Sequence, residues 1–187
     1  MRFDGRGSLL RLHAIQMAKA MGAQPYTTAG SDDKCRACEA LGAVKAINYK
    51  TQNFEDSLPS MDVILDMVGG DFIQKNLNLL ADDGRVNSIA FIRGFEAQIN
   101  FVPMVLKRLT ITGSTLRALS SEQKAIMAKE IARHIWPKIE QGAIKPVIDS
   151  VYAFEDVAKA HERMQSGEHI GKILLHVRKA ESEASCV

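Results

Sequence analysis

Residues suited to binding a phosphate follow a short β-rich segment near the start of the chain. Residues 25–29 (PYTTA) end at Gly30-Ser31, where a helix-prone segment begins that carries Lys34 in its first turn. A glycine, a hydroxyl and an ammonium at a helix N-terminus can hold a phosphate through backbone N–H groups, one O–H donor and a positive charge. In a dinucleotide-binding βαβ unit this corner distinguishes NAD from NADP, and an acidic residue here would favour NAD. An ordinary capped turn explains the same residues, because the two aspartates that open the helix suit any helix N-terminus.

Cys35 and Cys38 form a C-x-x-C motif, which can be a redox pair or half of a zinc site. A structural zinc ion needs four ligands. The chain has only one further cysteine, Cys186, and its five histidines are scattered without ligand spacing. A redox pair sits at a helix N-terminus, whereas these two cysteines fall inside a helix that begins near Ser31. The motif therefore indicates two structural cysteines, and the sequence predicts no metal site.

Length and composition narrow the class of protein. The 187 residues suffice for one well-buried domain and are too few for two of ordinary size. A net charge of +2 without a basic patch argues against a nucleic-acid partner. No apolar run approaches the ~20 residues of a membrane span, and the first residues lack a signal peptide's apolar core. With an odd number of cysteines, which argues against a disulfide framework, we expect a cytoplasmic protein.

Strand-like and helix-like segments alternate along the chain, which is typical of an α/β fold with a parallel sheet covered on both faces. The largely apolar run 63–68 stops at Gly69-Gly70, as a buried parallel strand does. Pro137 should end or kink a long helix that begins near Ser120. The sheet is expected to contain residues 26–29, 44–48, 63–68, 86–90 and 109–116. Helices are expected at 14–22, 32–41, 71–80, 103–108, 120–141 and 154–165, with a turn at Asp83-Gly84 and further strands at 147–152 and 172–177.

From residue 14 to residue 177 the chain resembles the quinone oxidoreductase (zeta-crystallin-like) branch of the medium-chain dehydrogenase/reductase superfamily. The resemblance rests on the ordered segments AIQMAKAMGA, TAGSDDKC, ALGA, INYK, VILDMVGG, LTITGSTLR, KPVIDSVY and GEHIGKILL, which are specific only together. It implies a Rossmann-like doubly wound parallel sheet, the cofactor NADP(H), and zinc-independent reduction of quinones or enal-type activated alkenes.

The resemblance also implies where the cofactor binds. Residue matching assigns the 2′-phosphate to Gly30, Ser31, Lys34 and Tyr49. It places Asp66, Met67 and Val68, after the fourth strand, and Ile89, Ala90 and Phe91, after the fifth, beside the ribose and nicotinamide. No catalytic residue is assigned in this chain. The family implies a homodimer through the edge strand Leu109–Leu116.

The match to the family weakens before residue 14. The family's glycine-rich phosphate loop corresponds to residues 4–11, where Gly5 and Gly7 are kept but Leu9 and Arg11 replace glycines that admit the pyrophosphate. Side chains there should obstruct the cofactor; partial compensation by the charge of Arg6 or Arg11 is the less favoured alternative. The first strand is reduced to residues 1–4, and a shifted reading frame before residue 14 is a fair hypothesis.

Two functions of different class remain open from the sequence. The chain is either the cofactor-binding portion of an NADPH-dependent quinone oxidoreductase, or a non-catalytic remnant that folds and dimerises but binds nucleotide weakly or not at all. A redox or metal module built on Cys35 and Cys38 is a distant third. The predicted organisation is an NADP-binding domain at 1–143, a segment at 144–177 that would join a catalytic domain, and a flexible tail at 178–187.

Overall fold

The computed structural model describes residues 2–3 and 8–177, with side chains from residue 10 onward. The chain divides into two compact units, one through Lys145 and one from Pro146. The predicted tail, as well as Gly5, Arg6 and Gly7, lies outside the described residues. The two units are described separately below.

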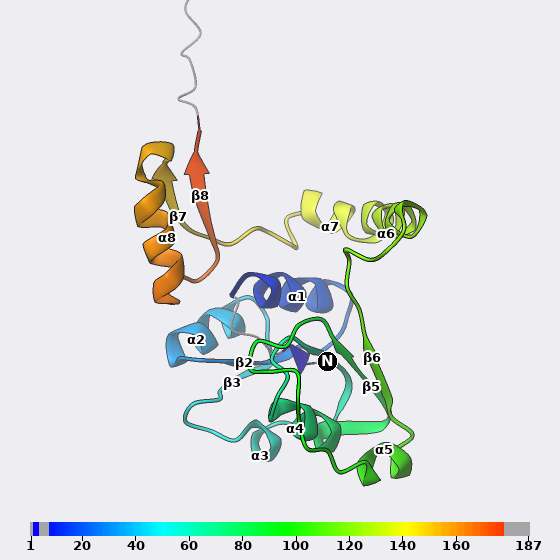
Figure 1. Ribbon diagram of the computed structural model, residues 1–187. Helices are drawn as coiled ribbons and strands as arrows, with labels where there is room; N and C mark the ends of the chain where they lie inside the picture. Colours follow the sequence, from blue (N-terminus) through cyan, green and yellow to red (C-terminus); the bar gives the residue numbers. More distant parts are fainter. Residues whose placement is uncertain (1, 4–7, 178–187) are drawn as a thin grey trace, which may run out of the picture. The chain divides into compact units, whose positions relative to one another are not determined.

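The first unit is built on a parallel sheet of six strands in the order β3-β2-β1-β4-β5-β6 (Figure 1). This strand order is that of the doubly wound dinucleotide-binding fold, so the Rossmann-like α/β prediction is confirmed. The strands are β1 (Arg2–Phe3), β2 (Tyr26–Ala29), β3 (Lys45–Asn48), β4 (Met61–Asp66), β5 (Leu80–Ser88) and β6 (Thr110–Gly113).

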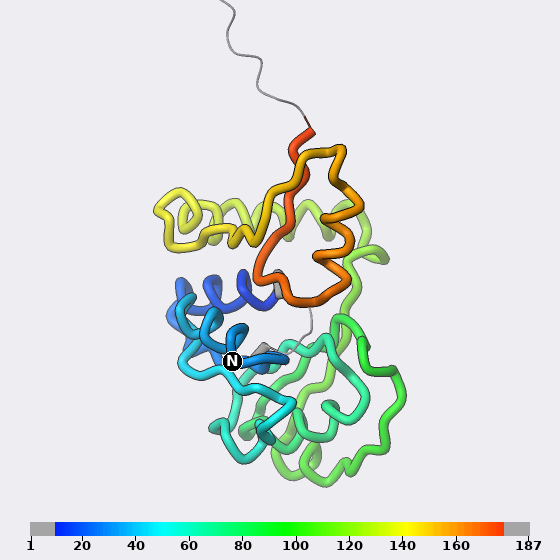
Figure 2. Tube along the Cα trace, turned by 90° about the vertical axis from the view of Figure 1, so that its left-hand side faces the viewer, coloured from blue at the N-terminus to red at the C-terminus, as the bar shows by residue number. Residues whose placement is uncertain are grey.

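Helices cover both faces of this sheet. The helix α1 lies beside α2 on one face, and α3 and α4 lie on the other (Figures 1 and 2). The helices of the unit are α1 (Ser8–Ala20), α2 (Asp32–Ala40), α3 (Phe54–Ser57), α4 (Phe72–Leu79), α5 (Val102–Leu106), α6 (Ser121–His134) and α7 (Trp136–Glu140). The change of strand order between β1 and β4 leaves the carboxyl ends of β2, β4 and β5 on one edge of the sheet, where such folds bind ligands.

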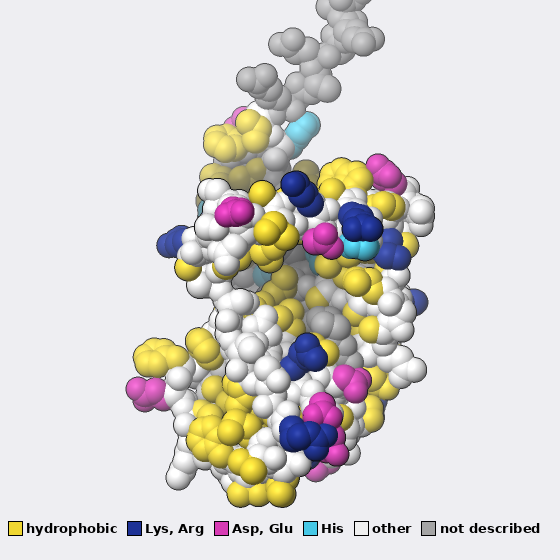
Figure 3. Space-filling view, turned by 90° about the vertical axis from the view of Figure 1, so that its right-hand side faces the viewer, with side chains coloured by type: hydrophobic (Ala, Val, Ile, Leu, Met, Phe, Trp, Pro, Cys, Tyr) yellow, Lys and Arg dark blue, Asp and Glu magenta, His cyan; other side chains and the backbone are white. Residues whose placement is uncertain are grey.

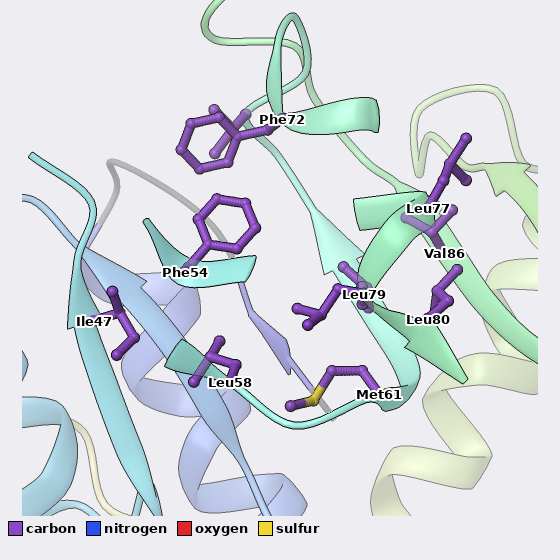
Figure 4. Packing of buried hydrophobic residues seen from close by; sticks show 11 residues of the cluster. Ile47, Phe54, Leu58, Met61, Phe72, Leu77, Leu79, Leu80 and Val86 are labelled. Atoms are coloured by element: carbon purple, nitrogen blue, oxygen red, sulfur yellow. The ribbon is translucent and has the colours of Figure 1, made fainter. Parts of the chain in front are cut away.

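The main hydrophobic core lies between the sheet and α3 and α4. In this core the rings of Phe54 and Phe72 stand 5.1 Å apart (Figure 4). Each fully buried side chain of this size contributes about 1.5–3 kcal/mol. The cluster consists of Ile47, Phe54, Leu58, Met61, Ile64, Val68, Phe72, Leu77, Leu79, Leu80 and Val86. Because Val68 and Phe72 belong to it, the core fixes the backbone that follows β4.

Two predicted boundaries are wrong, and for the strand the reason is a contact distant in sequence. The strand β5 begins at Leu80 rather than after a turn at Asp83-Gly84. Asp83 keeps a left-handed φ of 58° inside this strand, and Arg108 donates to its carboxylate over 2.8 and 2.6 Å. The helix α1 begins at Ser8 rather than at residue 14.

The expected long helix is two helices, because the helical conformation is interrupted at Ile135, shortly before Pro137. Pro137 lies in the first turn of α7, where a proline needs no N–H partner. The kink predicted from this proline is therefore present as a full break.

The second unit is a small βαβ element. It contains β7 (Ile148–Ala153), the short 3₁₀ helix η1 (Phe154–Asp156), α8 (Val157–Ser166) and β8 (Lys172–His176), with β7 and β8 paired in parallel. Arg163 donates to both carboxylate oxygens of Asp149 over 3.1 and 3.0 Å, and the Ile170 N–H donates to the same carboxylate over 2.8 Å. The Arg163 hydrogen bonds lower the pKa of Asp149 to about 2. This cluster ties the helix and the returning loop to the first strand.

Candidate functional site

The corner between β2 and α2 is closely packed around Gly30. A Cβ at this position would lie 2.8 Å from the Tyr49 Oη and 3.3 Å from its Cζ, so only glycine fits beneath the phenol as it stands. Ser31 is the N-cap of α2, and its hydroxyl oxygen accepts a hydrogen bond from the Lys34 N–H over 3.4 Å. Three of the four residues predicted for the phosphate site thus meet here, and Lys34 follows in the first turn of α2.

The acidic residues of this corner are held by other partners. Asp32 accepts a hydrogen bond from the Asn48 amide over 2.7 Å, and Asp33 forms an exposed ion pair with Arg36. The structure also brings a cation that the sequence reasoning missed, because the Lys50 Cε would lie 3.6 Å from a Gly30 Cβ. The sequence signal that could have identified Lys50 is its position directly after Tyr49, a predicted site residue. Together with Lys34, it gives the corner a second positive charge.

The loop that follows β4 is organised by Asp66. This carboxylate is 1% exposed and accepts hydrogen bonds from the N–H of Val68 over 2.8 Å and from the N–H of Gly69 over 3.3 Å. Gly69 and Gly70 adopt left-handed φ values of 69° and 54°, a region that glycine enters without steric cost. Asp66 therefore shapes the turn, rather than projecting into solvent as a free acid.

Backbone hydrogen bonds join this loop to the one that follows β5. The Ile89 N–H donates to the Asp66 carbonyl over 2.8 Å, and the Arg93 N–H donates to the Val68 carbonyl over 2.8 Å. The Gly70 N–H donates to the Gly94 carbonyl, also over 2.8 Å. The two predicted segments, Asp66–Val68 and Ile89–Phe91, therefore lie together at the carboxyl end of the sheet.

Two aromatic rings and a guanidinium connect the Gly30 corner to these loops. The Tyr49 ring meets the Phe72 ring edge-on with centroids 5.9 Å apart, and the Arg93 guanidinium lies 5.4 Å from the centre of the Phe72 ring. Arg93 also pairs with Asp71 over 3.0 Å. Sequence reasoning did not find Phe72 or Arg93, because both contacts join segments far apart in the chain. Through the buried Phe72 ring, these contacts link Tyr49 beside Gly30 to Arg93 in the loop after β5.

Arg11, which stands where the family's loop has a glycine, is turned into the protein. Its side chain is 3% exposed and donates to the Thr28 carbonyl of β2 over 2.6 Å. The guanidinium is therefore held in the interior between α1, β2 and α2. A phosphate at the surface would not meet this charge.

The character of the polar groups at this edge suits an anion rather than a metal ion. Within residues 2–3 and 8–177, no group of three or more histidine, cysteine, aspartate or glutamate side chains is placed to hold a metal. Over the same residues, no helix combines the length and apolar character required to cross a bilayer. The corner instead offers backbone N–H groups at a helix N-terminus, hydroxyls and lysines, which bind anions.

Comparisons with known proteins agree with this fold. A family model described as zinc-binding dehydrogenase matches residues 41–175, more than half of the chain. The mouse (Mus musculus) quinone oxidoreductase is 31% identical over 88% of this chain and 50% of its own length. The quinone oxidoreductase of Thermus thermophilus, solved also in complex with NADPH, shares the fold with a TM-score of 0.79 at 22% identity, over 94% of this chain and 57% of that one.

A solved NAD-dependent alcohol dehydrogenase is also similar, with a TM-score of 0.72 and 27% identity over 95% of this chain and 50% of that one. The chain thus spans about half the length of the curated relatives it matches. The family match, the strand order and these relatives together lead to one assignment. The chain belongs to the zinc-binding dehydrogenase family and is a quinone oxidoreductase-like member of the medium-chain dehydrogenase/reductase superfamily.

Proposed function

We propose that this chain supplies the nicotinamide-nucleotide-binding part of a zinc-independent quinone oxidoreductase and that it prefers NADPH to NADH. The observation that carries the proposal is the convergence of three sequence-distant segments at one edge of the sheet: the Gly30 corner, the loop after Asp66 and the loop after Ser88. The similar quinone oxidoreductases support this proposal, and the solved Thermus thermophilus relative is described with NADPH.

The phosphate corner fits a 2′-phosphate. The Ser31 hydroxyl accepts from a backbone N–H and so keeps its own proton for donation. The N-terminus of α2 carries a partial positive charge, and Lys34 and Lys50 would add full charges. The Tyr49 phenol, which lies beside Gly30, would border the bound phosphate. No acidic side chain stands at Gly30 or Ser31, where an NAD-specific site places one.

The loops after β4 and β5 would hold the nicotinamide end. The bound cofactor would supply a hydride to a quinone or activated alkene. The protein's contribution is position: Asp66 fixes the first loop, and the interloop hydrogen bonds fix the second loop against it. Phe91, half exposed beside Gly69, would exclude water from that end.

We propose that the quinone or activated alkene is contacted mainly by residues other than those described. Holding donor and acceptor together can supply about 7–11 kcal/mol of a barrier. This chain spans about half the length of its curated relatives, and we assign the enclosure of the second reactant to the part of those relatives that this chain does not match. We therefore expect this chain alone to turn over quinones poorly, whether or not it binds the nucleotide.

The alternative, a remnant that folds and dimerises but binds nucleotide weakly, is favoured by one observation. Arg11 replaces a family glycine and directs its charge inward, so it neither widens the phosphate loop nor offers a positive charge to it. Nucleotide affinity separates the two functions.

A homodimer through the edge of β6 forms part of the proposal. All four residues of Thr110–Gly113 are exposed, and β6 ends the sheet. Apolar side chains also gather over α5 on the same face (Figure 3). A second copy paired antiparallel about a two-fold axis would cover this open edge.

Titration calorimetry with NADPH and NADH tests the proposed cofactor preference. Lys34→Ala should weaken NADPH binding by about 1.5–3 kcal/mol, the range for a hydrogen bond to a charged group, and leave NADH nearly unchanged. Lys129→Ala, which removes an equal charge from the exposed surface of α6, is the matched control. Equal losses for both cofactors would refute the 2′-phosphate assignment, and no binding by the unmodified chain would favour the remnant.

A further inference from the structure

A buried amide at the end of β3 joins two charged residues of the Gly30 corner. Asn48 is 9% exposed and pairs in register with Ala29, the residue before Gly30. Its side-chain N–H donates to the Asp32 carboxylate over 2.7 Å, and its side-chain oxygen accepts from the Lys50 N–H over 3.2 Å. One amide thus holds an acid of α2 at one end and the turn that carries a lysine at the other.

Backbone hydrogen bonds fix the position of this amide before any ligand binds. The Asn48 carbonyl accepts from the N–H groups of Thr51 and Gln52 over 3.1 and 2.9 Å. The Tyr49 N–H donates to the Ala29 carbonyl over 3.0 Å. Because the turn is bonded on both sides of the Asn48 side chain, Asp32 is drawn toward a point that the end of β3 defines.

Asp32 differs from its neighbour in how its charge is treated. Asp33 forms an ion pair with Arg36, whereas the neutral amide of Asn48 holds Asp32. A hydrogen bond from an amide orients a carboxylate and leaves its negative charge in place. Asp32 directly follows Ser31, so the direction of its side chain decides how strongly that charge acts on the proposed phosphate site.

The same carboxylate has the chemistry of the opposite cofactor preference. An acid at the end of the second strand accepts from the ribose hydroxyls of NAD, and a carboxylate repels a phosphate group. If Asp32 were released from Asn48, it could rotate about its side-chain bonds toward the Ser31 hydroxyl. There it would oppose a 2′-phosphate and accept from an unmodified ribose.

We propose that Asn48 is a positioning residue that sets the ribose specificity of the Gly30 corner by holding Asp32 away from the ligand. With Asn48 in place, the corner selects a nucleotide that carries a phosphate on its ribose. Without it, Asp32 becomes a latent acceptor for a free ribose hydroxyl. This inference rests on the proposed function, because it names the residue that makes the same site selective.

Titration with two adenosine nucleotides, followed by amide chemical shifts, tests the proposal. Adenosine 2′,5′-bisphosphate and adenosine 5′-monophosphate differ only in the 2′-phosphate and omit the nicotinamide, so they report on the corner alone. Asn48→Ala should lower the ratio of bisphosphate to monophosphate affinity by about five- to tenfold, the effect of one close and partly exposed charge. Adding Asp32→Asn to that variant should restore the ratio to within about twofold of the original.

The rescue separates positioning from a merely structural role. If Asn48 only stabilised the turn, Asn48→Ala would weaken both nucleotides together, and Asp32→Asn would restore neither. Asn78→Ala is the matched control, because the Asn78 amide donates to the Glu55 carboxylate over 3.0 Å at the exposed end of α4. That variant should leave the ratio unchanged.

Asp32→Asn in the chain that keeps Asn48 decides the matter if Asn48→Ala fails to fold. A ratio within about twofold of the original would support the proposal, because the acid is then already held away from the phosphate. A rise of about fivefold or more would overturn it, since Asp32 would then act on the phosphate despite Asn48.

The outcomes also separate this inference from the proposed function. A preference for the bisphosphate that persists in Asn48→Ala, or a loss that Asp32→Asn does not rescue, overturns the role of Asn48 and leaves the cofactor proposal standing. Equal affinity of the unmodified chain for both nucleotides would overturn the 2′-phosphate assignment and this inference with it.

Discussion

Gly69→Ala tests whether the loops after β4 and β5 are held together as the structure shows. A Cβ at this position would lie 2.6 Å from the Gly94 carbonyl oxygen and 2.7 Å from a ring carbon of Phe91. Neither contact is tolerable, and the Gly94 oxygen belongs to the backbone, which cannot rotate away. The loops must therefore separate.

Two terms set the size of the effect. An alanine at a left-handed φ costs about 1 kcal/mol relative to glycine. Separating the loops also weakens the Gly70–Gly94 hydrogen bond of 2.8 Å, a further loss of about 0.5–1.5 kcal/mol. Because looser packing between the loops adds to both terms, we expect the free energy of unfolding to fall by about 2–3 kcal/mol.

Gly22→Ala is the matched control, because Gly22 also has a left-handed φ, 82°, but its Cβ would meet nothing within 4 Å. Only the conformational loss of about 1 kcal/mol should remain there. Urea unfolding of both variants, followed by the fluorescence of Trp136 in the first unit, measures the difference. If the two variants lose the same stability, the loops do not touch at Gly69. Gly69→Ala should also weaken NADPH and NADH equally, since it lies away from the phosphate corner.

Three further outcomes are expected. Asp149→Asn should destabilise the second unit by about 1–2 kcal/mol at neutral pH, seen as faster amide exchange in β7 and β8. Because the folded pKa of Asp149, about 2, lies below the unfolded value, this contribution is complete above pH ~5 and fades as the pH falls toward 2, so a pH-independent deficit would contradict it. Ile111→Pro should yield a monomer by light scattering while the fold is retained. The Ser114 N–H donates to the Ser88 carbonyl of β5, so the N–H of Ile111, an odd number of residues away, points to the open edge of β6 and is not needed within the sheet. An unmodified chain that is monomeric at micromolar concentration would refute the dimer. Finally, NADPH oxidation by this chain with a small benzoquinone should stay below about 1 per second, and saturable turnover above that rate would show that the chain encloses the reactants after all.

Local sequence signals located most of the sheet. The strands β2, β3, β4 and β6 begin within two residues of their predicted starts, because apolar runs and turn residues bound each of them. The start of β5 was missed because residues 82–84 (DDG) read as a turn. A tertiary ion pair with Arg108 holds Asp83 inside the strand instead. A local sequence pattern carries no information about this contact, because Asp83 and Arg108 are distant in sequence.

The candidate site was predicted only in part, because some of its contacts are also tertiary and leave no local sequence pattern. Gly30, Ser31 and Tyr49 do meet, and the segments after β4 and β5 do lie together. The roles of Phe72 and Arg93 depend on side chains that approach only after folding. The inward direction of the Arg11 side chain likewise depends on contacts that form only on folding, with the Thr28 carbonyl and with Cys38. Sequence alone shows only that a large cation stands where the family has a glycine.

Amide chemical-shift mapping of the chain with NADPH tests the central claim most directly, because it reports where the nucleotide binds as well as whether it binds. The account predicts saturable shifts at Gly30, Ser31, Lys34 and Tyr49 and in the loops 66–70 and 89–94. With NADH, the shifts in the loops should persist while those at Gly30 and Ser31 shrink. Shifts confined to other parts of the chain, or none at millimolar NADPH, would contradict the assignment of this edge of the sheet as a nucleotide site.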